Sequence, residues 1–373
     1  MKHMLRKISF VTPALLGIPL AGVAQVQKID VITTAVPFLR ITPDARAGAM
    51  GEAGIANSPD ANSQFYNVAK YPFAVHGSGI GATYTPWLTH LGLKDVYLAS
   101  LAGYYQLDEE QAFSASLKYF SLGNLQISDH NGNDLSTENP RELSLDIGYS
   151  RKLSSTLSLG VAVRYIHSSL AGGASADGVT YKAGNGFAAD LGLYYTTVTE
   201  KKGGWSAGAV LSNLGTKISY TSDDNQKSFL PANLGIGAGY TWITNEVHKL
   251  TLSGEINKLL VPAPPVNGTS DDYLKYSRKG VISSWASSFD NKALAYSAGG
   301  EYIYNDRFAV RAGYYADSRS MGKRNYFTTG LGIVYSVFGI NFSYLVPSGK
   351  STQVNPLSNT LRFSLVITPG ADK

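Results

Sequence analysis

Beyond residue 77 the chain alternates, position by position, between apolar residues and small or polar ones. In TLSLGVAVRYIH, residues 156–167, leucine, valine and tyrosine take every second position, and serine, glycine, alanine and arginine fill most positions between. The stretches ELSLDIGYS, NLGIGAGYTW and TLRFSLVI repeat the pattern. Because successive side chains of a strand point to opposite faces, this period predicts strands with one apolar face and one small or polar face.

Fourteen segments of this kind are predicted. They are residues 78–87, 95–106, 111–121, 141–152, 156–167, 185–198, 204–213, 231–243, 249–258, 293–304, 307–316, 325–335, 338–346 and 359–368. Tight turns, such as those near Asp108 and Asn305–Asp306, alternate with long loops, such as 122–140 and 259–292. Outer-membrane barrels have an even strand number, short periplasmic turns and long extracellular loops. We therefore predict an all-β fold, a 14-stranded antiparallel transmembrane β-barrel with both chain ends on the periplasmic side.

Composition separates this fold from a soluble β-sandwich, which also contains many short strands. Charged residues make up only 16% of the chain, against about 25% in typical soluble domains. A soluble sandwich would carry many lysine, glutamate and threonine residues on its outer face, whereas here one face is consistently apolar. Tyrosine and tryptophan cluster at segment ends, as membrane interfaces favour. These features favour the membrane barrel.

The first residues have the pattern of an export signal. Lys2, Arg6 and Lys7 precede the apolar run ISFVTPALLGIPLAGVA, which ends in small residues suited to cleavage after Ala24. The alternative is a membrane anchor, but two prolines interrupt the run and it is short for a span. We predict a signal peptide over residues 1–24 and a location in the outer membrane of a Gram-negative envelope.

Charge and cysteine content exclude several classes of function. The chain has 32 basic and 27 acidic residues, and removing the three basic residues of the signal leaves a net charge of +2. The basic balance therefore gives no reason to expect a nucleic acid partner. With no cysteine in the chain, a disulfide framework, a thiolate metal site and a lipid-modified cysteine after the signal are all excluded.

A few charged residues interrupt the small-residue face of the strands, and we expect them to point into the barrel lumen. They are Lys118, Asp146, Arg164, Asp190, Glu255, Glu301, Arg311 and Arg362. Signs alternate along neighbouring strands, and cations balance anions. A charge in a narrow lumen is costly unless it is paired, so the structural interpretation is a set of ion pairs that brace the wall. The alternative is a conduction or proton path, although a selective pore would favour one sign.

No motif predicts a catalytic, cofactor or metal site. GIGAGY, residues 235–240, lacks the G-x-G-x-x-G spacing and lies inside a strand, so its glycines are expected to face a crowded lumen. The histidines show no metal-ligand spacing. His167 and Ser168 are adjacent at a strand end, but a nucleophile and its base must meet in space, which sequence adjacency does not provide.

The loop at 259–292 is the longest between predicted strands. It opens with the stiff sequence PAPP and then carries four large aromatic residues, Tyr273, Tyr276, Trp285 and Phe289. Two interpretations remain open: these residues contact a protein partner, as aromatic anchors often do, or they pack over the barrel mouth as a lid. For the first interpretation we add two apolar residues from the loop before the eighth strand, Phe229 and Leu230.

The segment before the first strand is rich in Ala, Gly, Asn and Asp, and it is too small to bury a core of its own. Ser58, Pro59 and Asp60 offer a cap and a first-turn proline for a short helix, DANSQFYNVAKY. We predict that residues 25–76 form a partly helical hatch that enters from the periplasmic side and fills the lumen, and that residues 77–373 form the barrel.

The predicted architecture and parts of the sequence resemble a known family. A fourteen-stranded barrel with an N-terminal hatch resembles the long-chain fatty-acid transporter (FadL-like) superfamily of outer-membrane barrels. Within it, the elements VPFL, PDARAGAMGEAG and SPDANSQFYN..KY are similar to the PorV family of the type IX secretion system. Two features depart from relatives: Asn67 is followed by valine where Asn-Pro is common, and the chain lacks a C-terminal aromatic residue.

The resemblance implies a non-enzymatic shuttle that needs no cofactor. PorV-like proteins bind the C-terminal signal domain of exported cargo at the secretion translocon and pass it to a cell-surface sortase complex, which attaches the cargo to lipopolysaccharide. The expected partners are thus the translocon, the cargo signal domain, the sortase complex and outer-membrane lipid. The alternative is a FadL-like transporter of hydrophobic solutes, which would need an apolar pocket in the lumen.

Overall fold

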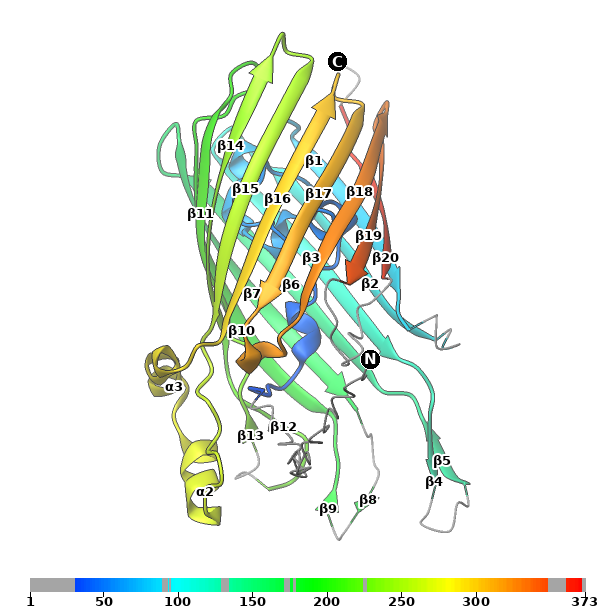
Figure 1. Ribbon diagram of the computed structural model, residues 1–373, viewed down its shortest axis with the longest axis vertical. Helices are drawn as coiled ribbons and strands as arrows, with labels where there is room; N and C mark the ends of the chain where they lie inside the picture. The colour runs from blue at the N-terminus through cyan, green and yellow to red at the C-terminus, as the bar shows by residue number, and fades with distance from the viewer. Residues whose placement is uncertain are drawn as a thin grey trace, which may run out of the picture.

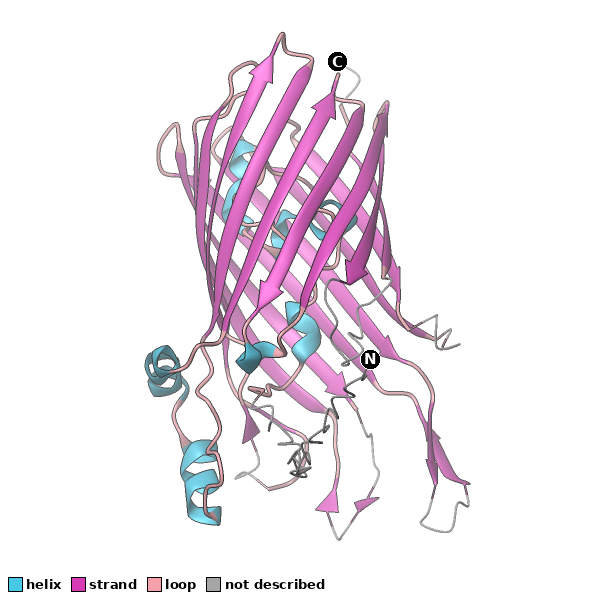
Figure 2. Cartoon of the chain, viewed as in Figure 1, coloured by secondary structure: helices cyan, strands magenta, loops and turns pink. Residues whose placement is uncertain are grey.

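Fourteen antiparallel strands close into a single barrel in the computed structural model (Figures 1 and 2). The structure describes residues 31–88, 93, 95–128, 134–170, 175–176, 179–223, 227–347 and 360–370. The barrel strands, in order, are β1 (Ser78–Pro86), β2 (Val96–Gln106), β3 (Gln111–Leu122), β6 (Arg141–Lys152), β7 (Leu157–Ser169), β10 (Gly184–Thr196), β11 (Gly204–Gly215), β14 (Asn233–Thr244), β15 (His248–Leu259), β16 (Leu294–Tyr304), β17 (Phe308–Asp317), β18 (Asn325–Tyr335), β19 (Phe338–Pro347) and β20 (Leu361–Ile367). Each predicted strand is present, so the predicted fold is confirmed.

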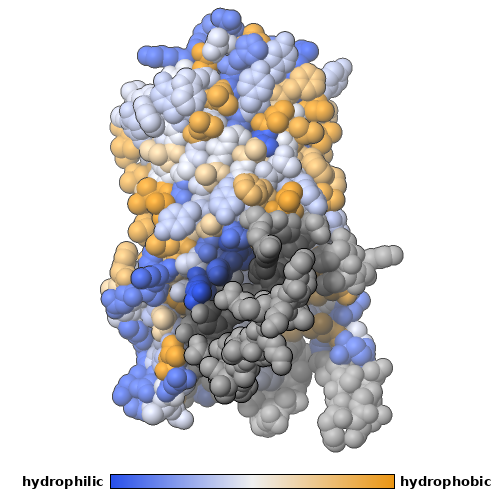
Figure 3. Space-filling view, in the orientation of Figure 1, coloured by the Kyte–Doolittle hydropathy of each residue, from blue (hydrophilic) through white to orange (hydrophobic). Residues whose placement is uncertain are grey.

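The two faces of the strands follow the alternation in the sequence. In β7 the outward side chain of Val163 is 64% exposed, whereas its neighbour Ala162, which points inward, is 4% exposed. Figure 3 shows hydrophobic side chains along the flank of the barrel and hydrophilic ones at its upper end. An exposed apolar flank around a closed ring of strands is the surface that contacts lipid.

The two ends of the barrel differ. Tight turns lie at the upper end in Figure 1, and longer connections lie at the lower end, here called the long-loop end. The long loops carry three small hairpins, a short 3₁₀ helix and a helical arm. These are β4 (Leu125–Ser128) with β5 (Asp134–Glu138), β8 (Ser175–Ala176) with β9 (Val179–Thr180), β12 (Ile218–Ser219) with β13 (Lys227–Ser228), η6 (Arg319–Met321), α2 (Ser270–Arg278), α3 (Val281–Ser287) and η5 (Ser288–Asp290).

The hatch runs through the whole lumen, in the described part from residue 31 to 76. Its first residues lie at the long-loop end, where Ile32 donates to the carbonyl of Ser320 and Ala35 to that of Phe229, both at 2.9 Å. Its last residues lie at the opposite end, where Gln106 donates to the carbonyl of Ala74. The expectation that the hatch begins on the same side as the C-terminus is therefore wrong for the described residues, because the segment is long enough to traverse the barrel.

Short turns, and no long helix, build the hatch. Its elements are η1 (Pro37–Arg40), α1 (Ala45–Gly48), η2 (Ser63–Phe65) and η3 (Val68–Phe73). The single helix predicted over DANSQFYNVAKY is wrong, because Asn67 is extended between η2 and η3. Its side chain accepts from the N–H of Ala69 and donates to the carbonyl of Leu193 in the wall, and these bonds replace a helical continuation.

Glycines allow the hatch to touch the wall backbone. Gly51 has a φ of +66°, and a Cβ added to Gly313 of β17 would lie 2.1 Å from the Gly51 nitrogen. The glycines of GIGAGY face the lumen as predicted, since a Cβ at Gly235 would lie 2.5 Å from Ile55 of the hatch. Larger side chains at these positions would push the hatch away from the wall.

A cluster of buried apolar residues lies at the long-loop end. It joins the start of the hatch, including Val36 and Phe38, to residues of the long loops and the ends of the strands. No helix among the described residues is both long and apolar enough to span a membrane. The predicted signal peptide, residues 1–24, lies outside the described residues.

Candidate functional site

Arg46 of the hatch forms one ion pair with the barrel wall and one within the hatch. Its guanidinium donates to both carboxylate oxygens of Glu301, at 2.9 and 2.7 Å, and to Asp60 at 2.8 Å. Glu301, whose side chain is 2% exposed, also accepts from Arg311 at 2.7 Å. The structure thus brings Glu301 and Arg311 together, as the alternation of charge suggested, and adds a third partner that strand periodicity does not reveal.

Glu255 and Arg362 bind the hatch and not each other. Glu255 accepts from the backbone N–H of Gly54 at 2.6 Å and from that of Ile55. Arg362 is fully buried in β20 and donates to Glu52 at 3.2 Å. These contacts hold the middle of the hatch against two different parts of the wall.

The predicted ion pairs among Lys118, Asp146, Arg164 and Asp190, which lie on four neighbouring strands, form only in part. Arg164 bridges Asp146 and Asp190, the second at 2.9 Å. Lys118 does not join them through an ion pair: its ammonium donates to two backbone carbonyls of the hatch, at 3.3 and 3.1 Å. The prediction that Lys118 takes part in an ion pair is therefore wrong, because hatch carbonyls accept its hydrogen bonds.

A β-bulge in β11 completes the cluster around Arg164. The register between β10 and β11 shifts at this point, and Asn213 adopts a φ of +56°. The N–H of Asn213 donates to Asp190 at 2.7 Å, and its side-chain oxygen accepts from Arg164. The bulge turns Asn213 inward, so that its amide groups satisfy hydrogen bonds of Arg164 and Asp190 that would otherwise be costly to leave unmade.

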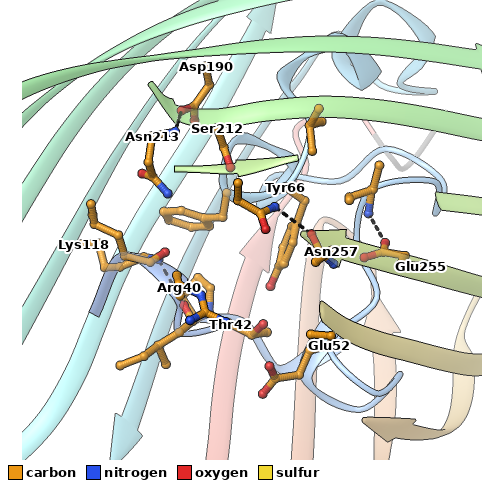
Figure 4. Close-up of a pocket in the computed structure, with 18 of the residues that line it drawn as sticks. Arg40, Thr42, Glu52, Tyr66, Lys118, Asp190, Ser212, Asn213, Glu255 and Asn257 are labelled. Atoms are coloured by element: carbon orange, nitrogen blue, oxygen red, sulfur yellow. Dashed lines mark hydrogen bonds between the residues drawn. The ribbon is translucent and has the colours of Figure 1, made fainter. Parts of the chain in front are cut away.

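A cavity of about 130 Å³ lies between this cluster and the hatch (Figure 4). Charged and amide groups from strands and hatch project into it, including Arg40, Glu52, Lys118 and Asn257. Sites for apolar ligands are lined mainly by hydrophobic and aromatic side chains. Apolar residues such as Ile41, Ile55 and Phe65 also line the cavity, but the many charged and amide groups among them suit water and polar groups better than an acyl chain.

His167 and Ser168 point to opposite faces of β7. His167 Nδ1 lies 2.8 Å from Asn185 Oδ1 and the residue is half-buried, whereas the buried Ser168 hydroxyl donates to Glu142 at 2.8 Å. The two residues therefore do not form a nucleophile and base. Among the described residues, no group of three or more His, Cys, Asp or Glu side chains is placed to hold a metal ion.

The longest loop forms an arm, residues 260–291, at the long-loop end. The first helix of the arm, α2, begins with a capping box in which the Thr269 side chain accepts from the N–H of Asp272 and the Asp272 carboxylate accepts from the N–H of Thr269. No residue of α2 is buried, so the helix presents most of its surface to solvent.

Lys217 and Tyr276 fix α2 to the barrel mouth. Lys217 Nζ donates to the carbonyls of Ser277 and Lys279, at 2.7 and 2.5 Å, where the helix C-terminus favours a cation. Partial burial lowers the pKa of Lys217. Tyr276 packs edge-on against Phe229 with ring centroids 5.5 Å apart. The arm is therefore held at its base.

The four aromatic residues predicted in this loop differ in exposure. Tyr273 is 47% exposed and Phe289 is 63% exposed, whereas Tyr276 and Trp285 are half-buried. Figure 1 places α3 beside the barrel and outside its outline, so this helix does not cover the mouth as a lid.

Phe229 and Leu230 cannot serve as surface contacts. They are only 4% and 3% exposed, because both belong to the apolar cluster at the mouth. The carbonyl of Phe229 also binds the hatch at Ala35. The prediction that these two residues contact a partner is wrong for this structure.

A family model now fits this architecture. The model described as "Type IX secretion system protein PorV" matches residues 24–266, more than half of the 373 residues. The chain belongs to the PorV family. The match spans the hatch, nine barrel strands and the start of the arm. The chain is thus an outer-membrane β-barrel, and its family implies involvement in type IX secretion. No curated protein sequence matches the chain.

Solved structures support the fold of this PorV family member. The toluene transporter TbuX of Ralstonia pickettii is similar with a TM-score of 0.54 and 13% identity over 87% of this chain and 96% of TbuX. The deltaS2S3 mutant of TodX, a monoaromatic hydrocarbon channel, has a TM-score of 0.52 and 14% identity over 87% and 96% of the two chains. A Pseudomonas aeruginosa FadL homologue has a TM-score of 0.48 and 10% identity over 91% and 99%. At such identities the first two show a shared fold alone.

Proposed function

We propose that this protein is a non-enzymatic shuttle subunit of the type IX secretion system. In this role it binds the C-terminal signal domain of exported cargo at the translocon and delivers it to the cell-surface sortase complex. The observation that carries the proposal is the contrast between a lumen filled by a fixed hatch and an arm that exposes apolar residues outside the barrel. Together with the PorV family, this contrast favours function at the surface over passage through the lumen.

The ion pairs of the hatch support a role for the barrel as a rigid support and for the loops as the binding surface. Arg46, Glu255 and Arg362 each join hatch to wall through buried charged groups, and breaking such contacts costs several kcal/mol. A barrel closed in this way acts as a rigid body embedded in lipid. Its loops then meet cargo and partners by reversible association.

The exposed side of α2 is the proposed contact with protein partners. Tyr273 and Leu274 are 47% and 40% exposed there, and aromatic residues are frequent anchors of interfaces. Lys217 and Tyr276 already hold the helix, so little conformational freedom is lost on binding. In this proposal Tyr276 positions the surface and does not touch the partner.

Transport of hydrophobic solutes is the rival function. The similar fold of hydrocarbon transporters makes it worth testing, but the lumen cavity is lined by charged and amide groups, including Glu52, Lys118 and Asp190. A narrow polar cavity of about 130 Å³ gives this rival no specific support.

Replacement of residues 262–289 by a short Gly-Ser linker tests the proposal. We expect the variant to fold, because the strands on either side keep their register, but to lose cargo display and recovery of cargo or translocon components from solubilised outer membranes. A matched variant with the β4–β5 hairpin shortened should keep both. Heat-modifiable gel mobility checks that each barrel has folded. Intact cargo display without the arm, with only fatty acid or detergent co-purifying, would refute the shuttle.

A further inference from the structure

The second helix of the arm, α3, lies at the side of the barrel. In Figure 1 it stands outside the barrel outline, at the level where β15 ends and β16 begins. Because it is displaced sideways from the barrel, α3 lies over the region that a bilayer around the wall would occupy. Helix α2 extends further from the barrel than α3 does (Figure 2).

The outward face of α3 is apolar. Ile282 and Ala286 of α3 and Phe289 of η5, the turn that continues it, recur at the spacing of one helical face and are all exposed, Ile282 by 76% and Phe289 by 63%. These fractions match those of side chains on the lipid-facing wall, such as Phe187 at 66% and Ile236 at 57%. Large apolar side chains this exposed are normally covered by lipid or protein.

Charge separates the two helices of the arm. Residues 280–289, which include α3, carry no charged side chain, whereas α2 and the residue after it carry two aspartates, two lysines and an arginine. The i,i+4 pair of Asp271 and Lys275, at 2.7 Å, lies on the exposed surface of α2. Thus α2 suits water, whereas α3 suits an apolar boundary.

The serine hydroxyls of α3 and its C-terminal extension are bonded within the helix. Ser283, Ser284, Ser287 and Ser288 each donate to a backbone carbonyl three residues earlier, at 2.9, 2.5, 3.2 and 2.6 Å. A hydroxyl that is satisfied in this way does not need water. A serine-rich helix can therefore enter a poorly hydrated layer without leaving donors unpaired.

The lipid-facing wall continues up to the base of the arm. Ile256 of β15 and Tyr296 of β16 face each other across the strand pair on the outer side, and they are 52% and 47% exposed. Each lies near the strand end from which the arm leaves, and Phe289 precedes β16 by only a few residues. The apolar face of α3 is thus close in the chain to an established lipid contact.

We propose that α3 is an interfacial anchor whose Ile282–Ala286–Phe289 face is buried in the outer leaflet of the membrane. Half-buried Trp285, a residue type enriched at membrane interfaces, lies within the same helix. The lipid surface, and no second protein, covers this face. With α3 held in the leaflet and Lys217 bound to the C-terminus of α2, α2 points away from the membrane. This anchor follows from the membrane position of the barrel and does not depend on the shuttle function.

Single cysteines test the anchor cleanly, because the chain has none of its own. A nitroxide is attached at Ile282→Cys, at Ala286→Cys and, as the control on α2, at Tyr273→Cys, in the full-length protein reconstituted in phosphatidylcholine vesicles. Power saturation then compares accessibility to oxygen, which concentrates in lipid, with accessibility to a water-soluble nickel chelate. We expect an oxygen-to-nickel ratio several-fold higher at both α3 sites than at Tyr273.

Labels at two α3 positions, 282 and 286, ensure that local unfolding caused by one substitution does not decide the result. Nickel accessibility at both α3 positions equal to that at Tyr273 would overturn the anchor. Shielding that is absent in vesicles and present only in native membranes would also overturn it, because it would show that a bilayer alone does not cover the face. Cargo display is scored separately, so loss of the shuttle function would leave this result intact.

Discussion

Replacement of Arg46 by methionine should loosen the hatch without unfolding the barrel. Methionine keeps much of the apolar stem and removes the guanidinium, which makes two contacts to Glu301, one to Asp60 and two to Ser58. Glu301 would still be paired with Arg311 at 2.7 Å, and Asp60, whose side chain is 24% exposed, could take up water. The loss in the free energy of hatch docking is therefore smaller than it would be if a buried charge were left fully unpaired.

The magnitude follows from these contacts. Hydrogen bonds to charged groups contribute about 1.5–3 kcal/mol each, but the remaining partners recover part of that, so we expect a loss of about 3 kcal/mol in hatch docking. This corresponds to a population of the undocked hatch that is higher by on the order of 100-fold. Arg46→Lys, which keeps the charge but not the two-pronged geometry, should fall between the wild type and Arg46→Met.

Native-state hydrogen exchange measures this population. The amides of Gly48, Ala49 and Met50 are bonded within the hatch, so their exchange reports local opening. Exchange of this segment should be on the order of 100-fold faster in Arg46→Met. The control is Arg151→Met, which removes an exposed pair with Glu110 at 3.8 Å and should change little. Equal exchange in Arg46→Met and wild type would show that the ion pair does not hold the hatch.

Three further predictions concern the wall and the arm. Glu255→Gln removes a charged acceptor of two hatch N–H groups and should speed exchange of the Gly54 amide on the order of 10- to 100-fold, read by the same exchange experiment; no change would contradict it. Tyr276→Ala should make trypsin cleave the arm faster, because the stack on the mouth and a bond to Pro262 are lost, whereas Tyr273→Ala should not. Val163→Arg places a charge on the lipid face and should lower barrel stability by about 2–4 kcal/mol in a urea titration in vesicles, whereas an unchanged midpoint would refute a lipid contact there.

Most of the barrel could be predicted from the sequence because it obeys one local rule. The alternation of side chains, with a period of two residues, specifies which of them face lipid and which face the lumen. Each strand of the barrel repeats this alternation independently. The prediction for residues 141–152 matches β6 at both ends. The hatch was recognisable from its small residues and its family resemblance, but its internal turns were not, since Asn67 is extended for reasons that lie in the wall.

The partners of the lumen charges could not be predicted. Alternation shows that Lys118 and Glu255 point inward, but it says nothing about what occupies the space they point into. Backbone groups of the hatch, which have no sequence signature, bind both of them. The pair of Glu301 and Arg311 could be predicted from the sequence, because the two residues lie on adjacent strands joined by a tight turn.

The sequence of the arm contains a helix-start motif that an analysis of strand periodicity does not detect. Thr269 and Asp272 have the spacing of a capping box, which is a sequence mark of a helix start, and it precedes α2. Phe229 is different: its burial depends on the hatch reaching the long-loop end, a path that no local pattern encodes.

A reversible lock on the hatch tests the central claim that the lumen is closed and function lies at the surface. A Cβ added at Gly81 of β1 would lie 3.3 Å from the Cβ of Ala61, just below the usual spacing of disulfides, and 2.9 Å from Oδ1 of Asn62, whose side chain has to shift. In Ala61→Cys/Gly81→Cys cells, oxidation should form the cross-link, and cargo display should remain equal to that of each single-cysteine control. Loss of display on oxidation, restored by a reductant, would show that the hatch must move and would contradict the account.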